Sequence, residues 1–257
     1  MCLSRRLLVV CFAVAVTAGC GKNSQPTRDE RLGPAPALEP SRLPTLKPGV
    51  NEQTATLPGG GTLRYTISVP RGYDGKARVP LVVALHYGGD VTPFYGRGMI
   101  DGLVGPALKG LGAVIVAPDS LGGDWTTEEN ERAVVWLTRS VLKSYAIDPK
   151  RVLLTGYSMG GQGTWYLGSR HQDLFTAAIP VAGGPQGGTD WKVPVYVIHG
   201  KADEVLPLAA TERHVEQLKA AGAKVELHVV PALTHYQTGR YAAPLREALP
   251  WLRKVWE

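Results

Sequence analysis

A serine between two glycines marks the stretch of the sequence with the clearest chemical potential. Residues 156–160 read Gly-Tyr-Ser-Met-Gly, directly after the short apolar run 152–154 and before a stretch with helical spacing. A nucleophile on a tight turn from strand to helix needs small neighbours, because the backbone is strained and other elements approach closely. The spacing therefore predicts that Ser158 is a nucleophile lifted above one edge of a sheet.

A serine hydroxyl is a poor nucleophile at neutral pH, so it needs a base, and the base needs an orienting partner. Asp203 follows the apolar run 195–198, and His235 follows the run 225–230. The order along the chain, serine then aspartate then histidine, is that of the α/β-hydrolase triad. We predict that His235 is the general base and that Asp203 holds its imidazole in the required tautomer.

The sequence offers one other acid and three other histidines near these positions. Glu204, next to Asp203, is the rival acid. His199 precedes a glycine in the same loop and is predicted to orient that loop. His214 falls within a helical pattern and His228 within a strand pattern, so both are interpreted as surface or packing residues.

Acyl transfer also requires N–H donors for the oxyanion. The amide of Met159, directly after the nucleophile, is predicted to be one of them. Residues 86–89 read His-Tyr-Gly-Gly and follow the apolar run 81–85, which places them in the loop where the second donor should lie. The sequence leaves open whether the amide of Tyr87 or that of Gly88 donates.

Aromatic residues beside these loops are candidates for substrate contact. Trp125 lies in the loop after the run 113–117, at the same predicted sheet edge, although core packing is its alternative role. Tyr236 directly follows the predicted base, and Tyr87 lies in the predicted oxyanion loop. We expect substrate contacts from these three residues.

The elements that must position these residues alternate along the chain. Continuous apolar runs indicate strands buried on both faces of a parallel sheet, whereas the period-two run 63–69 indicates a half-exposed strand. Between the runs lie helical patterns, the first of them with the capping-box spacing of Thr126 and Glu129. This alternation predicts a single α/β domain, a mostly parallel central sheet with helices on both faces. The short, glycine-rich stretch 183–190 leaves no room for a cap domain. The predicted strands are 63–69, 81–85, 113–117, 152–154, 177–181, 195–198 and 225–230, and the predicted helices cover 134–145, 207–222 and 241–256, the last bent near Pro250.

The first twenty residues contain all three cysteines, Cys2, Cys11 and Cys20, so the rest of the chain can form no internal disulfide and no thiolate metal site. A charged start followed by the apolar run 7–18 is typical of a secretory signal. As a helix this run would rise only about 18 Å, too little to cross a bilayer core of roughly 30 Å.

Residues 17–20 read Thr-Ala-Gly-Cys and resemble the lipobox of bacterial lipoproteins, in which the cysteine becomes acylated. An ordinary signal peptide with an incidental cysteine is the alternative. We predict a signal peptide over 1–19, a lipidated Cys20 with a proline-rich tether over 20–50, and a hydrolase domain over 51–257. The protein is then expected to be exported to a bacterial cell envelope and anchored to a membrane.

Composition excludes several other classes. Hydrophobic residues make up 44% and charged residues 19%, which argues against a disordered chain and against a multi-pass membrane protein. The 28 Lys and Arg exceed the 22 Asp and Glu by a net charge of +6, or +4 without Arg5 and Arg6 of the predicted leader. No basic run with interleaved aromatics is present, so we expect no nucleic-acid partner.

From about residue 60 onward the chain resembles the α/β-hydrolase superfamily. The run 156–165, Gly-Tyr-Ser-Met-Gly-Gly-Gln-Gly-Thr-Trp, is similar to that of phospholipase/carboxylesterase and dienelactone-hydrolase-like esterases, with the related feruloyl-esterase and polyhydroxybutyrate-depolymerase-like secreted proteins. The resemblance implies their fold and their Ser-Asp-His mechanism. Relatives often have His-Gly where this chain has His86-Tyr87, and the bulky tyrosine would narrow an acyl pocket or stack on an aromatic acid.

These observations together predict a serine hydrolase that cleaves carboxylic esters through an acyl-enzyme, with no metal or organic cofactor. A serine peptidase on the same fold is one alternative, because the same groups also cleave amides. A non-catalytic binding module on a hydrolase fold is the other.

Overall fold

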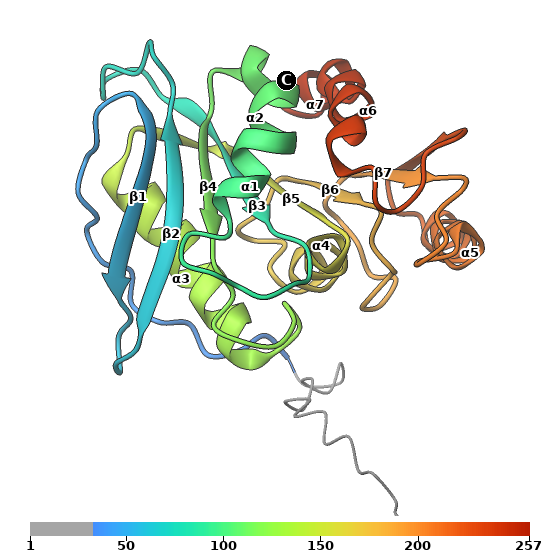
Figure 1. The fold of residues 1–257 in the computed structure, drawn as a ribbon, viewed down its shortest axis with the longest axis horizontal. Coiled ribbons are helices and arrows are strands. Elements are labelled where there is room, and N and C mark those ends of the chain that lie inside the picture. The colour runs from blue at the N-terminus through green and yellow to red at the C-terminus, as the bar shows by residue number, and fades with distance from the viewer. Residues whose placement is uncertain (1–32) are drawn as a thin grey trace, which may run out of the picture.

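The apolar runs pair into one eight-stranded sheet in the computed structural model, which describes residues 33–257 (Figure 1). Across the sheet the order is β1-β2-β4-β3-β5-β6-β7-β8. Strand β2 is antiparallel to both of its neighbours, and every other neighbouring pair is parallel. The strands are β1 (Gly49–Thr56), β2 (Thr62–Val69), β3 (Val79–Leu85), β4 (Val114–Pro118), β5 (Ile147–Tyr157), β6 (Ala177–Val181), β7 (Val195–Gly200) and β8 (Val225–Val230).

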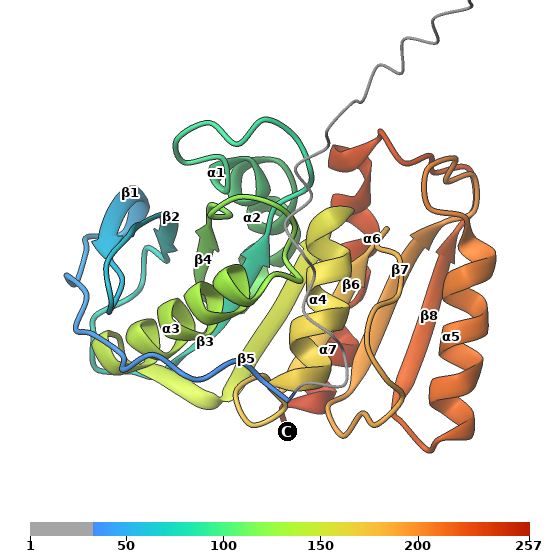
Figure 2. The ribbon, with the colours of Figure 1, turned by 90° about the horizontal axis from the view of Figure 1, so that it is seen from below.

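Helices cover both faces of the sheet (Figure 2). Helices α3, α4 and α5 pack on one face, and the segment from α1 to η2 packs with α6 and α7 on the other. The predicted α/β fold with a mostly parallel sheet is confirmed, and the described residues contain no separate cap domain. The helices are α1 (Arg97–Met99), η1 (Ile100–Val104), α2 (Gly105–Leu108), η2 (Lys109–Leu111), α3 (Glu128–Ser144), α4 (Met159–Arg170), α5 (Leu208–Ala220), η3 (Thr238–Tyr241), α6 (Ala242–Glu247) and α7 (Leu249–Val255).

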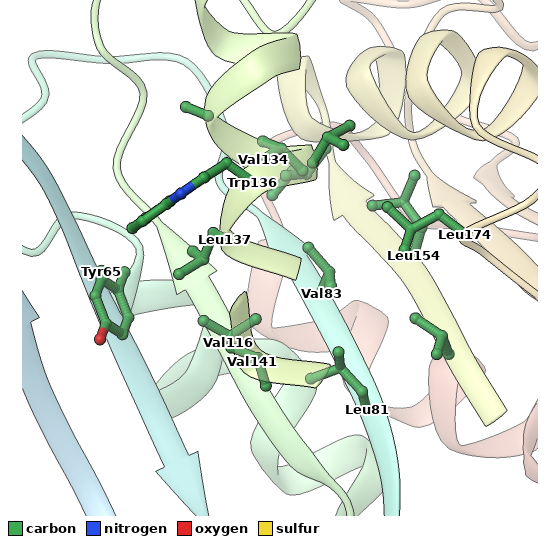
Figure 3. Packing of buried hydrophobic residues seen from close by; sticks show 14 of the residues in the cluster. Tyr65, Leu81, Val83, Val116, Val134, Trp136, Leu137, Val141, Leu154 and Leu174 are labelled. Atoms are coloured by element: carbon green, nitrogen blue, oxygen red, sulfur yellow. The ribbon is translucent and has the colours of Figure 1, made fainter. Parts of the chain in front are cut away.

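Side chains of the central strand β3 explain the two-sided packing. Leu81, Val83 and Leu85 belong to the core cluster under α3, whereas Val82 and Ala84 belong to the cluster under α2 and α6. Successive side chains of a strand point to opposite faces, so a run without polar residues can only be buried from both sides. Figure 3 shows two of these residues beside the apolar side chains of α3.

Helix α3 begins one residue later than the capping-box pattern predicts. Thr127, not Thr126, is the N-cap, and its side-chain oxygen accepts a hydrogen bond from the amide of Asn130. Thr126 instead bonds the carboxylate of Asp124 through both its amide and its hydroxyl. Either of the two adjacent threonines could cap the helix, but Thr126 is already hydrogen-bonded in the turn around Asp124, so Thr127 is the N-cap.

The described part of the proline-rich segment, residues 33–48, lies along α3 rather than reaching freely away from the domain. We call it the strap. Its main-chain amides at Ser41, Leu43 and Leu46 donate to side chains of α3 and of the residue that follows it, at 2.7–3.2 Å. Leu38, Leu43 and Leu46 pack against the core. The composition alone predicts a tether for these residues, because a proline-rich segment that docks on a domain has neither helical nor strand periodicity.

A buried carboxylate holds the start of the strap. Glu131 is fully buried, and its Oε1 accepts hydrogen bonds from the amide of Ala35 at 2.9 Å and from His171 at 2.8 Å. Its Oε2 accepts from the hydroxyl of Tyr166 at 3.0 Å, and Arg170 lies 3.3 Å from Oε1. Burial acts to raise the pKa of Glu131, but the hydrogen bonds from His171 and Ala35 and the nearby positive charges outweigh it and lower the pKa to about 2.

Substitution Glu131→Ala is expected to lower the free energy of unfolding by about 3–5 kcal/mol, because it leaves buried partners unsatisfied. The wild-type contribution should be fully present above pH 4.5 and should fade as the pH falls toward 2, since the lowered pKa means that the unfolded chain binds more protons. Urea unfolding at several pH values measures both effects. Glu129→Ala, an exposed carboxylate in the same turn of α3, is the matched control and should cost less than about 1 kcal/mol. Equal losses of unfolding free energy in Glu131→Ala and Glu129→Ala would contradict the stabilising role of Glu131.

Candidate active site

The tight turn predicted around the serine is present between β5 and α4. Ser158 has φ 56° and ψ −116°, a conformation that non-glycine residues rarely adopt and that costs of order 1–3 kcal/mol. Its amide donates to the carbonyl of Val181 in β6 at 3.0 Å, which helps to fix the turn. The side chain is half-buried at the carboxyl edge of the sheet.

The glycines on either side have a steric reason. A Cβ at Gly156 would lie 2.2 Å from the carbonyl oxygen of Gly160, and a Cβ at Gly160 would lie 2.0 Å from that of Leu85. Both contacts are with main chain, which cannot swing aside as a side chain can. Only hydrogen therefore fits at these two positions.

Substitution Gly160→Ala is expected to destabilise the fold by at least about 1–3 kcal/mol, the usual range for overpacking. It should also lower activity, since relief of the clash must move β3 or the turn that carries Ser158. Thermal unfolding and ester turnover check the two effects. Gly188→Ala is the control, because a Cβ there meets nothing within 4 Å. A Gly160→Ala variant as stable and active as Gly188→Ala would contradict the steric argument.

The three residues predicted to act together lie in hydrogen-bond contact. Ser158 Oγ is 2.8 Å from His235 Nε2, and His235 Nδ1 is 2.8 Å from Asp203 Oδ2. Asp203 lies in the loop after β7 and His235 in the loop after β8, so the carboxyl ends of three parallel strands bring them to one edge. Asp203 and His235 are both buried.

The carboxylate of Asp203 is oriented by main chain. Its Oδ1 accepts hydrogen bonds from the amides of Val205 at 3.0 Å and Leu206 at 2.7 Å, which leaves Oδ2 for the imidazole. Nδ1 of His235 then carries the proton that it donates to Oδ2. Nε2 is left as an acceptor for the hydroxyl of Ser158.

The rival acid, Glu204, also contacts His235, but at the main chain. Its Oε2 accepts a hydrogen bond from the His235 amide at 3.0 Å. On the other side, the hydroxyl of Tyr157 donates to the His235 carbonyl. Burial raises the pKa of Tyr157 to about 12, so this hydroxyl keeps its proton at neutral pH. Sequence reasoning overlooked both contacts, because an isolated carboxylate and a tyrosine inside the serine motif carry no pattern.

His199 is not free to serve as a base. Its Nε2 donates to the carbonyl of Leu206 at 2.7 Å, and its Nδ1 accepts from the hydroxyl of Thr211 at 3.2 Å. Burial lowers the pKa of His199, so the ring is neutral and its 3.6 Å approach to Asp203 is not an ion pair. His199 therefore holds the end of the loop that carries Asp203.

His214 and His228 lie away from the three residues. His214 lies in α5 with its ring edge-on to Trp165, at a centroid distance of 5.1 Å. His228 lies in β8 and stacks on Tyr196 at 6.2 Å. Both contacts are packing contacts on the flanks of the sheet.

Hydrogen bonds to two of its main-chain carbonyls hold the loop after β3 in place. Trp125 Nε1 donates to the carbonyl of His86 at 2.8 Å, and His86 Nδ1 donates to the carbonyl of Tyr87 at 2.7 Å. In a trans peptide the N–H points away from the C=O. The first bond therefore fixes the direction of the Tyr87 amide, and the second fixes that of the Gly88 amide.

The ring of His86 is itself fixed. Its Nε2 accepts from the amide of Ser120 at 3.0 Å, and burial lowers its pKa, so the ring is neutral with the proton on Nδ1. Gly88 faces the start of α4, since a Cβ built on it would lie 3.9 Å from the Cβ of Met159. The loop and the turn that carries Ser158 are thus neighbours.

The expectation that Trp125 contacts substrate is corrected by its burial. Only 1% of the residue is exposed, and it packs against α4 so closely that a Cβ at Gly163 would lie 2.4 Å from the Cβ of Trp125. Trp125 lies between α4 and the loop that contains His86 and supports that loop. Of the other two candidates, Tyr87 is half-buried, whereas Tyr236 is 78% exposed with its ring edge-on to that of His235 at 5.7 Å.

Comparisons with known proteins identify the family and the fold. The sequence model of the dienelactone hydrolase family matches residues 111–246. An uncharacterized secreted protein of Arthroderma benhamiae is 27% identical over 237 residues, covering 75% of this chain and 25% of that protein. A bifunctional acetylxylan esterase/xylanase of Neocallimastix patriciarum is 31% identical over 134 residues, covering 49% of this chain and 20% of that protein.

A crystal structure of a thermostable esterase superposes with a TM-score of 0.67 at 26% identity, covering 80% of this chain and 62% of that one. The chain thus spans a quarter or less of the two sequence relatives and under two thirds of this structure. The family match covers more than half of the chain and includes Ser158, Asp203 and His235. The chain therefore belongs to the dienelactone hydrolase family and has the α/β-hydrolase fold.

Proposed function

We propose that the protein is a serine hydrolase that cleaves carboxylic esters, with Ser158 as nucleophile, His235 as general base and Asp203 as the acid that orients it. The observation that carries this proposal is the unbroken hydrogen-bond chain from Ser158 Oγ through the imidazole to Asp203. The position of Ser158 on a strained turn before α4 supports its role as nucleophile, because this turn exposes the hydroxyl to a substrate.

In the first half of the reaction, Ser158 Oγ attacks the ester carbonyl carbon while its proton passes to His235 Nε2. Asp203 stabilises the imidazolium that forms. When the tetrahedral intermediate collapses, the bond to the alcohol oxygen breaks and Nε2 returns the proton to that oxygen. The products are a free alcohol and an acyl group on Ser158.

In the second half, water attacks the acyl carbonyl and gives a proton to Nε2 of His235. Collapse of the second tetrahedral intermediate releases the carboxylic acid and restores the hydroxyl of Ser158. The clamp on the His235 main chain by Glu204 and Tyr157 keeps the imidazole in place while its charge changes.

We assign the oxyanion donors to the amides of Met159 and Gly88. The amide of Met159 begins α4, where helix N–H groups are unpaired. Gly88 is favoured over Tyr87 because it lies against Met159, which carries the other donor. Preorganised donors of this kind are worth about 10²–10³ in kcat each.

The ester class is supported by relatives named as esterases, and the contact residues proposed for the substrate are Tyr87 and Tyr236. A series of acyl esters and matched acyl amides tests the reaction class on the wild-type enzyme. We expect turnover of the esters and at least about a hundredfold slower turnover of the amides. Comparable rates on peptides would favour a peptidase, and absence of turnover on every substrate would favour a binding module.

We also propose that the protein is exported and anchored to a membrane. The signal peptide over 1–19 and the acylation of Cys20 lie outside the described residues, and the tether is proposed for the part of 20–50 that precedes the strap. Similarity to the secreted protein of Arthroderma benhamiae supports export. Among residues 33–257 no helix is long and apolar enough to cross a membrane.

A further inference from the structure

Basic side chains gather at the amino ends of the strands, the edge of the sheet opposite to Ser158. Two neighbouring cavities of about 490 and 320 Å³ open there. Arg71 and Lys109 line the first, and Arg151 and Arg253 line the second. We call this surface the basic edge. It consists of Arg71, Lys76, Arg78, Lys109, Lys150, Arg151, Arg253 and Lys254.

Acidic groups offset only part of this charge. Asp148 pairs with Arg151 at 2.7 Å, and Asp74 accepts hydrogen bonds from the amides of Lys76 and Ala77. Glu257, at the end of the chain, lines the smaller cavity. Arg71, Lys109 and Lys254 are exposed and form no ion pair within residues 33–257, so their charge faces solvent.

The chain enters the domain toward the same end of the strands. Helix α4 starts at the carboxyl edge beside Ser158 and ends at Arg170, whose guanidinium donates to the carbonyl of Gly33. The 12 residues of α4 rise about 18 Å. Gly33 therefore lies beside the end of α4 that is remote from Ser158, toward the amino ends of the strands.

We propose that the basic edge is an interaction surface for anionic phospholipid headgroups. Basic residues close to an anionic bilayer gain electrostatic attraction. A lipid surface is the favoured occupant because residues 21–32 span at most about 45 Å, so acylation at Cys20 would keep this edge within reach of the bilayer. In that orientation Ser158 faces away from the membrane. Lipid binding is independent of ester hydrolysis, whereas the orientation rests on the proposed acylation.

Vesicle sedimentation tests the surface itself. The chain from Gly21 onward suits this assay, since it retains every described strand and helix and all core clusters. At low salt we expect it to bind vesicles that contain phosphatidylglycerol and not vesicles of phosphatidylcholine alone. Binding should be lost in high salt, because salt screens such contacts.

The decisive variant combines Arg71→Gln, Lys109→Gln and Lys254→Gln. Partition onto the anionic vesicles should fall about a hundredfold, given roughly fivefold for each basic residue near the surface. Turnover of a soluble ester should not change, so a result here is distinguishable from failure of the proposed hydrolase.

The matched control combines Lys201→Gln, Arg213→Gln and Arg240→Gln, which removes the same charge from other surfaces and should retain most binding. Equal loss in both triple variants would overturn the proposal, because net charge alone would then explain binding. Equal binding of the wild type to neutral and anionic vesicles, or no binding to either, would also overturn the proposal. Binding of an anionic polysaccharide as tight as that of the lipid, lost in the same variant, would assign the edge to that polymer instead.

A labelled cysteine tests the orientation on the anchored full chain. The sequence has no cysteine after Cys20, so Lys109→Cys or Lys201→Cys supplies a unique site in the domain for a fluorophore. We expect nitroxide-labelled headgroups to quench the probe at position 109 and to leave the probe at 201 unaffected. Equal quenching, or the reverse pattern, would contradict the orientation.

Discussion

Ser158→Ala is expected to lower kcat for ester hydrolysis by about 10⁴- to 10⁶-fold, with little change in stability. Loss of the nucleophile in such a triad costs this much, and the residual rate comes from the oxyanion donors and from binding. The variant keeps the turn, because the hydrogen bond that fixes it runs from the residue 158 amide to Val181. Steady-state kinetics on one soluble ester, with thermal unfolding in parallel, gives both numbers.

The control is a serine-to-alanine change within α4, the helix that Ser158 precedes. Ser169 lies near the other end of α4, where its hydroxyl donates to the carbonyl of Tyr166. Ser169→Ala should retain nearly full activity. If Ser158→Ala keeps more than about a tenth of the wild-type rate while folded, Ser158 is not the nucleophile.

Asp203→Asn is expected to lower kcat by about 10⁴-fold, the effect seen when a triad acid becomes an amide in a serine protease. The asparagine would present either an oxygen without charge or an NH₂ group to His235 Nδ1, and the second option favours the wrong tautomer. The two main-chain amides that hold Oδ1 remain available to the amide oxygen, so the loop should stay in place. Kinetics across pH separates loss of the base from loss of the fold.

Glu204→Gln is the matched change one residue later. Glutamine keeps an oxygen that can accept the hydrogen bond from the His235 amide and loses only the charge, so kcat should fall no more than about tenfold. A larger effect for Glu204→Gln than for Asp203→Asn would reverse the assignment of the acid.

The position of the site followed from the sequence because each predicted residue lies in the turn or loop after an apolar run. Parallel strands place such residues at one edge whatever the details of packing, so Ser158, Asp203 and His235 could be expected to meet. The burial of β3 on both faces follows from the same pattern, since a run without polar residues has no face for solvent.

The residues that support the site and the strap could not be predicted in the same way. Trp125 follows a strand as a substrate contact would, but the absence of a side chain at Gly163 opens a space in α4 that its ring fills. The docked strap escaped notice because its leucines are spaced by prolines rather than by a helical or strand period. Strand β1 was missed as well, because its residues are largely exposed and polar.

Labelling with a fluorophosphonate, followed by peptide mapping, tests most directly whether the hydrogen-bonded serine is activated. The reagent forms a stable phosphonyl ester only with a nucleophilic oxygen, so we expect one adduct on the folded wild-type chain, located on Ser158. The Ser158→Ala variant should remain unlabelled under the same conditions. An adduct on another residue, or equal labelling of both proteins, would contradict the assignment of Ser158.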